Sequence, residues 1–450
     1  MSRGFWACQH AMLSWTSLDA WHGPSYNRRA PWRELWSMRA KEAGMERTAD
    51  VIIIGAGVMG TSTAFQLVQR GIKRVVVVEK STVAAGSSGK SSALVRMHYT
   101  FLPEARLALA SLKWFQEWHD RVGGRCGFTK TGFIRLVAPD KTALLRRNVE
   151  RLQQVGINTS LLSGDDLRQL DPTVETSDIA VAAYEPDSGY ADGYATAQAF
   201  MEAARRGGAT LHQGVTVTGF QVQGERIQGV ETTSGAIAAP VVISTAGPWS
   251  GPLLRRIGVD LPLVPSRHQV MILERPPAVS APLTYITGGS LYFRPDAAGL
   301  TLVGYGPGQD GVDPDAYRDS VDDDIKAEGA VHIAQRLPAM QDAGMRRGYA
   351  GCYTMTPDGK MIVDQAPGIS GLYIGSGFSG TGFKISPAVG IALAELATTG
   401  HATAVDVVPF SATRFAEGRM LRALHEYLDR PYDPVDTHSA TLRPDMSLDR

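Results

Sequence analysis

The sequence predicts an α/β fold whose core is a Rossmann-like parallel sheet. A continuous β-branched run, which is typical of a strand buried on both faces of a parallel sheet, occurs at residues 51–54, and further buried strands are predicted at 75–78 and 241–244. Two glycine-rich stretches, 55–60 and 375–382, each directly follow a predicted strand and precede a helical pattern. A strand, a tight turn and a helix in this order form the repeating unit of doubly wound α/β proteins.

Length and composition exclude several other classes of protein. The chain has 450 residues, of which 44% are hydrophobic and 20% charged, which suits two or three domains and rules out wholesale disorder. Its 45 Lys and Arg balance its 45 Asp and Glu, whereas a protein that binds nucleic acid usually carries a basic excess. No apolar run approaches the roughly 18–20 residues that cross a membrane. We therefore expect neither a nucleic-acid partner nor a membrane span.

The cysteines indicate a reducing compartment. The three cysteines, Cys8, Cys126 and Cys352, lie too far apart in the chain for a disulfide framework or a C-x-x-C metal site. No other cluster of His, Cys and Asp has the spacing of metal ligands. We expect a cytoplasmic protein without a metal.

The first predicted strand opens a complete βαβ unit of the kind that binds a dinucleotide. In the G-x-G-x-x-G turn, Gly55 makes the tight turn, Gly57 leaves room for a pyrophosphate and Gly60 lets the helix pack against the strand. The helix N-terminus supplies N–H groups and partial positive charge for the phosphates. The second strand ends at Glu79, nineteen positions after Gly60, where an acid can accept hydrogen bonds from ribose hydroxyls. The motif alone does not separate NAD from FAD.

Two further loops favour FAD over NAD. A small-residue loop at 84–92, which contains Ser88, allows the backbone to approach an extended ligand closely. The late glycine loop, 375–384, leads into a helix that we expect from about Pro387 to Leu396, closed by Gly400. Two glycine loops at strand-to-helix turns suit a long cofactor with two ends.

With these motifs the chain resembles the D-amino-acid oxidase superfamily of flavoenzymes, in particular its sarcosine oxidase and dimethylglycine dehydrogenase branch. The resemblance runs from about residue 49 to 415 and is most distinctive in GSGFSGTGFKISPAVG at 375–390. It implies a Rossmann-like FAD-binding domain of the glutathione-reductase-2-like type, interleaved with a substrate domain built on a mixed or antiparallel sheet. The expected parts are an N-terminal extension (1–47, expected to be disordered), an FAD-binding domain (48–125, 190–260 and 345–415), a substrate domain (126–189 and 261–344) and a C-terminal helix and tail (416–450).

The resemblance also assigns roles to residues of this chain. Arg96 and Lys384 match basic residues that hold a substrate carboxylate, and Tyr292 resembles a tyrosine of the substrate pocket. His268 is a candidate acid or base near the substrate, with a purely structural role equally open. The expected cofactor-binding positions are Gly55, Gly57, Gly60, Glu79, Lys80, Ser88, Val215, Ala246, Gly247, Gly380, Thr381, Gly382 and Lys384.

The activity implied is FAD-dependent oxidation of the C–N bond of a small secondary or N-methylated amino acid, such as sarcosine, by hydride transfer to the flavin N5. The electron acceptor is O₂ or a redox partner, and a place in a larger oxidoreductase stays open. The alternatives are an FAD-binding assembly or interaction protein with little turnover, and an NAD dehydrogenase, against which the second glycine loop argues.

Four departures from the family pattern bear on these expectations. Ala93 stands in place of a second arginine near the substrate, and Thr381 in place of a histidine beside the flavin. Gly351 stands where the covalent flavin cysteine would be, with Cys352 one residue later, so its side chain points the opposite way on a strand and we predict noncovalent FAD. The stretch 300–305 lacks the lysine that activates O₂, which makes a dehydrogenase plausible.

Overall fold

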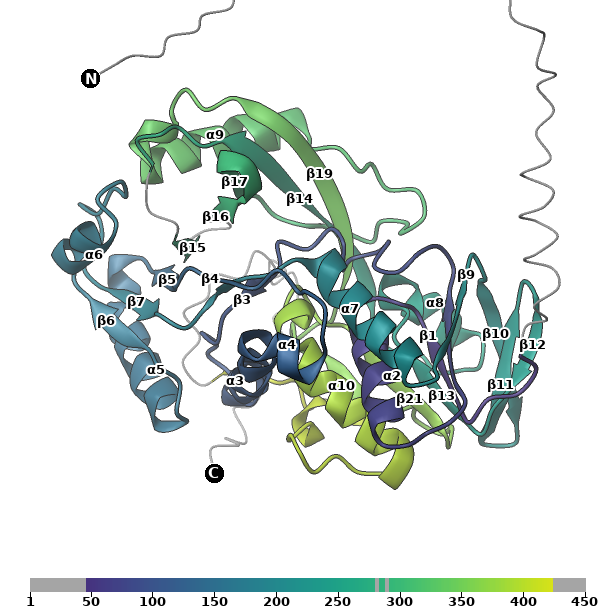
Figure 1. Ribbon diagram of the computed structural model, residues 1–450. Helices are drawn as coiled ribbons and strands as arrows, with labels where there is room; N and C mark the ends of the chain where they lie inside the picture. The colour runs from purple at the N-terminus through teal and green to yellow at the C-terminus, as the bar shows by residue number, and fades with distance from the viewer. Residues whose placement is uncertain (1–45, 280–282, 288–290, 424–450) are drawn as a thin grey trace, which may run out of the picture. The chain divides into compact units, whose positions relative to one another are not determined.

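The computed structural model describes residues 46–279, 283–287 and 291–423 (Figure 1). Within them, a six-stranded sheet follows the order β20-β21-β13-β1-β2-β9. The strand β1 pairs in parallel with β2 and β13, and the edge strand β20 runs antiparallel to β21. The predicted Rossmann-like sheet is therefore confirmed. The bounds of its strands are β1 Val51–Ile54, β2 Val75–Glu79, β9 Thr210–Gln213, β13 Val241–Ser244, β20 Ile362–Gln365 and β21 Leu372–Ser376.

Four helices supply most of the apolar side chains that pack with this sheet in one core. They are α2 (Val58–Gln69), α3 (Leu102–Gln116), α7 (Gly193–Arg206) and α10 (Gly382–Thr399). The helices α2 and α10 cross closely, because a Cβ added to Gly390 would lie 2.1 Å from Ser62 Oγ.

The helix α10 ends as predicted but begins earlier than predicted. Gly400 caps it with a left-handed φ of 80°. Its first residue is Gly382 and not Pro387, which lies inside the helix. Proline removes one backbone hydrogen bond there, and burial of Phe383 and Ile385 offsets that loss.

A second sheet follows the order β18-β14-β17-β16-β15-β5-β7-β6, with β19 paired to β14. Its pairings are antiparallel except that β15 runs parallel to β5, which confirms the predicted mixed sheet. Apolar side chains of this sheet and of α6 and α9 form a separate core. The bounds are β5 Phe133–Leu136, β6 Ser160–Leu162, β7 Ala182–Glu185, β14 Val264–Glu274, β15 Thr284–Ile286, β16 Tyr292–Asp296, β17 Leu300–Gly304, β18 Gln309–Asp310, β19 Met345–Met355, α6 Gly164–Leu170 and α9 Asp323–Arg336.

Smaller elements complete the described chain. A three-stranded sheet, β3-β8-β4, carries the chain toward Arg96, and another, β10-β11-β12, follows β9. Their bounds, with those of the remaining α-helices, are β3 Leu94–Val95, β4 Thr129–Lys130, β8 Gly189–Tyr190, β10 Val217–Gln223, β11 Arg226–Thr232, β12 Gly235–Ala238, α4 Trp118–Arg121, α5 Thr142–Gln154 and α8 Ser250–Arg255.

Both predicted ends of the chain fall largely outside the described residues. Of the predicted extension 1–47, only the last two residues are described. Of the predicted C-terminal helix and tail, 416–450, only residues 416–423 are described, and they form a turn and irregular chain. The strand β19 lies in the predicted FAD-binding part, yet it pairs with β14. In the described part of the chain, every helix is too short or too polar to cross a membrane.

A fully buried ion pair fastens the last described segment to the parallel-sheet unit. Arg414 Nε lies 2.8 Å from Asp358 Oδ2, and both side chains are 0% exposed. Arg414 Nη2 also donates to Asp358 Oδ1 and to the Lys360 carbonyl, at 3.0 and 2.8 Å. Burial raises the pKa of Asp358, but the hydrogen bonds and charge of Arg414 outweigh it and hold that pKa below its usual range.

Candidate cofactor and substrate site

One cavity of about 1060 Å³ lies between the two large sheets. The ends of β1 and β2 and both glycine loops line it from one side, and residues of β14, β16 and β19 line it from the other. Side chains alternate along β14: His268 and Val270 line the cavity, whereas Met271 and Leu273 belong to the core on the opposite face. The cavity therefore lies at the carboxyl ends of the parallel strands, where doubly wound sheets bind their ligands.

The early glycine loop, 55–60, has a backbone that larger residues could not adopt. Gly55 has φ +97°, and a Cβ there would lie 2.7 Å from the Thr245 carbonyl oxygen. A Cβ on Gly60 would lie 1.9 Å from the Gly55 carbonyl oxygen, so only glycine fits at this position in the first turn of α2. These contacts bring the N-terminus of α2 to the cavity.

Groups suited to a dinucleotide surround that helix N-terminus. Its N-cap, Gly57, has no side chain to cap it, and Val58 N–H donates to Ser88 Oγ at 3.0 Å. The Glu79 carboxylate is fixed at the C-terminal end of β2 because it accepts hydrogen bonds from Ala56 N–H and Ser81 N–H, both at 2.8 Å. The helix end suits phosphates and the fixed carboxylate suits ribose hydroxyls, so these residues fit the predicted cofactor.

Replacing Gly57 by alanine should weaken FAD binding while the fold survives. The backbone of Gly57 (φ −72°, ψ 177°) suits alanine, and the added Cβ would meet only Ser88 Oγ, at 3.0 Å. The methyl group would press on the hydroxyl that caps Val58, so we expect affinity to fall about tenfold, the effect of one lost hydrogen bond. A flavin titration measures it, with Gly219→Ala as control, because Gly219 in β10 does not line the cavity. Equal affinity of both variants would contradict this assignment.

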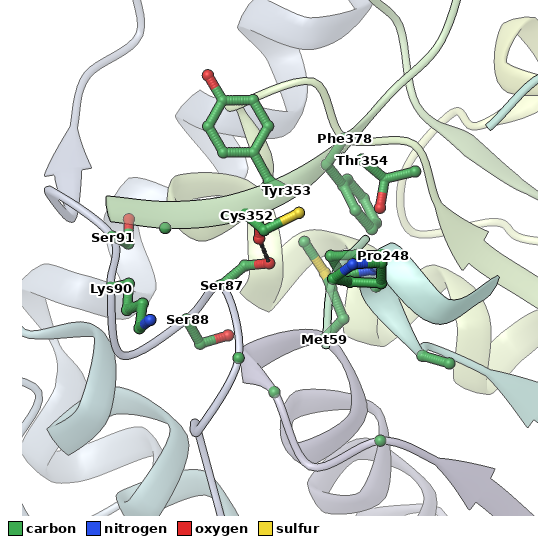
Figure 2. A pocket seen from close by; sticks show the side chains of 18 of the residues that line it. Met59, Ser87, Ser88, Lys90, Ser91, Pro248, Cys352, Tyr353, Thr354 and Phe378 are labelled. Carbon is green, nitrogen blue, oxygen red and sulfur yellow. Dashed lines mark hydrogen bonds between the residues drawn. The ribbon is translucent and has the colours of Figure 1, made fainter. Parts of the chain in front are cut away.

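The late glycine loop closes the other end of the cavity and contacts the early one. A Cβ on Gly382 would lie 3.3 Å from Met59 Cε, and one on Gly380 (φ +82°) would lie 3.2 Å from the Tyr353 hydroxyl. Thr381 is the N-cap of α10, but its hydroxyl donates to the Phe378 carbonyl at 2.7 Å. Figure 2 shows Met59, Pro248 and Phe378 gathered on one side of the cavity, with Ser88 and Lys90 on the other.

Most predicted positions line this one cavity. All of the predicted cofactor-binding residues do so except Gly60, which is packed inside the turn, and Val215. Val215 N–H donates to the Glu79 carbonyl at 3.0 Å, and its neighbours Thr216 and Val217 line the cavity instead. The four predicted catalytic residues, Arg96, His268, Tyr292 and Lys384, line the same cavity.

Arg96 is held rigidly at the end of β3. One of its terminal nitrogens donates to the His98 carbonyl, and its guanidinium lies 4.5 Å from the Tyr99 ring centroid and 5.6 Å from that of Phe133. Its Nε is buried and makes no hydrogen bond within the described residues. A guanidinium with an unused buried N–H is prepared to bind a planar anion.

Lys384 supplies a second basic side chain, which is buried, in the first turn of α10. The residue is 5% exposed, and its Nζ lies 3.5 Å from the Gly380 carbonyl oxygen. Burial, and then the charge of Arg96, lower the pKa of Lys384 well below its usual value, against the opposing effect of Glu104. An anion bound beside both groups would stabilise the charged form of Lys384.

His268 and Tyr292 face the cavity from the second sheet. Burial lowers the pKa of His268 to about 3, so its imidazole is neutral at physiological pH. Its ring stacks on Tyr353 at 3.9 Å, and its Nε2 lies 2.9 Å from Ser266 Oγ. Burial raises the pKa of Tyr292 despite a hydrogen bond with Ser92. A neutral histidine is suited to accepting a hydrogen bond, whereas the lowered pKa of His268 disfavours taking up a proton.

Sequence reasoning missed a buried carboxyl group beneath Arg96. Glu185, 0% exposed, accepts hydrogen bonds from Met97 N–H at 2.9 Å and from Ser188 Oγ at 2.7 Å. Burial raises its pKa from 4.5 to about 7. Nothing in the sequence around Glu185 indicates this position, because Met97 and Glu185 meet only in the folded chain.

The raised pKa of Glu185 predicts a loss of stability as pH rises. The folded protein holds this proton more tightly than the unfolded chain, so the stabilisation is complete below pH 4.5 and is lost as pH rises toward about 7. The loss amounts to about 3 kcal/mol at most. Denaturant unfolding at pH 5 and pH 7.5 should show it in the wild type and show much less of it in Glu185→Gln. Equal pH dependence of the two proteins would contradict the placement.

The residues at the expected site of covalent attachment do not favour a flavin bond. A Cβ on Gly351 would lie 3.0 Å from Lys90 Cβ, so a larger side chain there would press on Lys90. The next residue, Cys352, is buried, and burial raises the pKa of its thiol to about 11. Its carbonyl accepts a hydrogen bond from Ser87 Oγ at 2.5 Å, drawn in Figure 2.

Comparison with known proteins agrees with this geometry. A protein-family model described as FAD dependent oxidoreductase matches residues 50–396. The chain is 28% identical over 415 residues to FAD-dependent oxidoreductase domain-containing protein 1 of Bos taurus, covering 82% of this chain and 85% of the relative. It is 28% identical over 384 residues to monomeric sarcosine oxidase of Bacillus sp. (strain B-0618), covering 81% and 96%.

Solved structures share the fold. L-Proline dehydrogenase from P. horikoshii has a TM-score of 0.79 at 26% identity, covering 84% of this chain and 100% of that one. Glycine oxidase from Geobacillus kaustophilus has a TM-score of 0.73 at 25% identity, covering 82% and 99%. The predicted arrangement of a dinucleotide-binding sheet and a second mixed sheet is thus confirmed.

Proposed function

The chain belongs to the DAO family of FAD-dependent oxidoreductases, and on this premise we propose that it oxidises the C–N bond of a small secondary or N-methylated amino acid. The observation that carries the proposal is a pair of basic side chains, the half-buried Arg96 and the buried Lys384, at a cavity that both glycine loops line. Two basic groups largely removed from water call for an anionic ligand, and an amino acid supplies a carboxylate. The names of similar proteins, a sarcosine oxidase and a glycine oxidase, refer to small amino acids of this kind.

We assign the cofactor to the side of the cavity that the parallel sheet forms. The N-terminus of α2, with Gly55 and Gly57, holds the pyrophosphate, and Glu79 holds the ribose. The late loop, from Gly380 to Lys384, contacts the ring system. Bound FAD supplies the acceptor for the hydride equivalent that leaves the substrate carbon.

Arg96 and Lys384 orient the substrate. The planar guanidinium binds two carboxylate oxygens at once, and its contacts with the His98 carbonyl and the Tyr99 ring fix its direction. Lys384 adds a second hydrogen-bond donor from α10, whereas Arg96 follows β3. Burial excludes water from these contacts and strengthens them, so one orientation of the substrate is selected before reaction.

The neutral imidazole of His268 is in the form that accepts a hydrogen bond from a substrate amine. Ser266 holds its Nε2, and stacking on Tyr353 fixes the plane of the ring. We assign His268 a role in positioning the amino group.

FAD is held without a covalent bond in this proposal. The raised thiol pKa of Cys352 disfavours the thiolate, and Lys90 restricts the space at Gly351. The strand β17, Leu300–Gly304, offers no lysine toward O₂ chemistry. The electron acceptor (O₂ or a redox partner), a larger complex and the cytoplasmic location stay predictions.

The test is anaerobic addition of amines to the purified protein. Sarcosine, dimethylglycine, proline and glycine are added in turn, and the visible flavin absorption is followed. Bleaching by at least one of them is the expected result. A flavin that no amine reduces would overturn the proposal and favour an FAD-binding assembly or interaction protein.

A further inference from the structure

A segment of irregular chain from the second sheet reaches the nucleotide side of the cavity. It consists of residues 311–321, between β18 and α9, and we name it the strap. Five of its residues line the same cavity as both glycine loops: Asp313, Pro314, Asp315, Tyr317 and Asp319. The strap is thus part of the cofactor cavity, although it lies far from every motif of the sequence.

The base of the strap is fixed by a buried arginine. Arg267 is 2% exposed and donates to the carbonyls of Arg318 and Ser320, at 2.6 and 2.5 Å. It also pairs with Asp322 at 2.7 Å, and the Ala350 N–H donates to the Asp319 carbonyl at 2.6 Å. This end of the strap is therefore held firmly to β14 and β19.

The tip of the strap reaches the dinucleotide-binding unit. The Asp315 carboxylate pairs with the Lys80 ammonium and accepts a hydrogen bond from Trp249 Nε1 at 3.0 Å. Lys80 Nζ also lies 4.3 Å from the centre of the Trp249 ring. Farther along, Lys90 Nζ donates to the Tyr317 hydroxyl at 2.8 Å.

These contacts place the tip at the nucleotide end of the cavity. Lys80 directly follows Glu79 at the end of β2, and Trp249 follows β13, so both belong to turns at the carboxyl ends of the parallel strands. Lys90 belongs to the small-residue loop whose Ser88 caps α2. The strap thus spans from the second sheet to the three turns that surround the nucleotide.

We propose that the strap is a latch: it closes over bound FAD and slows its release, and the contacts of Asp315 with Lys80 and Trp249 hold it closed. The side chains of Asp315 and Lys80 are 59% and 34% exposed, so this ion pair is individually weak and can open in solution. The buried contacts of Arg267 keep the base in place while the tip opens. Closing the tip over the nucleotide half slows both the entry and the release of the cofactor.

The variant Asp315→Ala tests the latch. Its matched control is Asp187→Ala, which removes another Lys–Asp surface pair, with Lys130 at 2.6 Å, away from the cavity. Release of FAD from the loaded protein is followed by the fluorescence of free flavin, which requires no turnover and is independent of the amine proposed above. We expect release about tenfold faster for Asp315→Ala, the effect of one ion pair and one charge-assisted hydrogen bond, and unchanged for Asp187→Ala.

A second variant and a second readout keep the test decisive. Trp249→Phe keeps an aromatic ring but removes the N–H donor to Asp315, and should speed release by a smaller factor, about threefold. FAD association should also become faster in Asp315→Ala. Wild-type rates of release and association in both variants would overturn the latch.

Discussion

The variant Arg96→Ala is expected to lower kcat/KM for the amino-acid substrate by about 10²-fold or more while FAD content stays intact. Removing one partner of a buried, hydrogen-bonded charge pair costs about 2–5 kcal/mol, and the guanidinium here is fixed by the His98 carbonyl and the Tyr99 ring. Lys384→Met should give a comparable loss, because Lys384 is only 5% exposed and its removal leaves the bound carboxylate without its second cationic partner. Steady-state kinetics with a flavin spectrum of each variant measures both effects.

The control for both variants is Arg168→Ala, which removes an exposed arginine paired with Asp165 at 2.7 Å. It should leave kcat/KM unchanged, since exposed pairs contribute little. An amine without a carboxylate should react equally slowly with wild type and Arg96→Ala. Loss of FAD from Arg96→Ala, or an equal effect on the carboxylate-free amine, would show that Arg96 does not bind the carboxylate.

The variant Arg414→Met should destabilise the protein by about 3–5 kcal/mol. It leaves the Asp358 carboxylate, 0% exposed, without its charged partner, and such an uncompensated buried charge is the costly outcome of breaking an ion pair. Urea unfolding of the variant and the wild type measures the change. The site lies apart from the cavity lining, so the FAD spectrum of the folded variant should be unchanged.

Comparing Arg168→Met with Arg414→Met shows how the loss of stability on removing an arginine depends on the burial of its ion pair. The first variant breaks the exposed pair with Asp165 and should cost less than about 1 kcal/mol. The double variant Arg414→Met with Asp358→Leu should recover part of the stability, because no charge is then left buried. A urea midpoint of unfolding for Arg414→Met that equals that of the wild type within error would contradict the structural account of the Arg414–Asp358 pair.

The early dinucleotide-binding unit could be predicted because its signals are local. The strands β1 and β2, the glycine turn and Glu79 lie within 30 residues, and each carries its own pattern. The start of α10 could not be placed correctly, because Pro387 is typical of a helix start and the burial of Phe383 is visible only after folding.

Which residues meet at the cavity could be predicted only in part. The resemblance brought Arg96 and Lys384 to one site, although they are far apart in the chain. The contact of Glu185 with Met97 joins residues 88 positions apart, and that of Lys90 with Tyr317 joins residues 227 positions apart. Neither pair has a pattern that links its members, since pairing across sheets depends on register and packing.

The most direct test of the central claim, a carboxylate held beside the flavin by Arg96 and Lys384, compares two amines that differ only in that carboxylate. Under anaerobic conditions, sarcosine or whichever amino acid reduces the enzyme is compared with its amide, by the rate of flavin bleaching. The account predicts rapid bleaching by the acid and bleaching slower by about 10²-fold with the amide. Equal rates with acid and amide would contradict it.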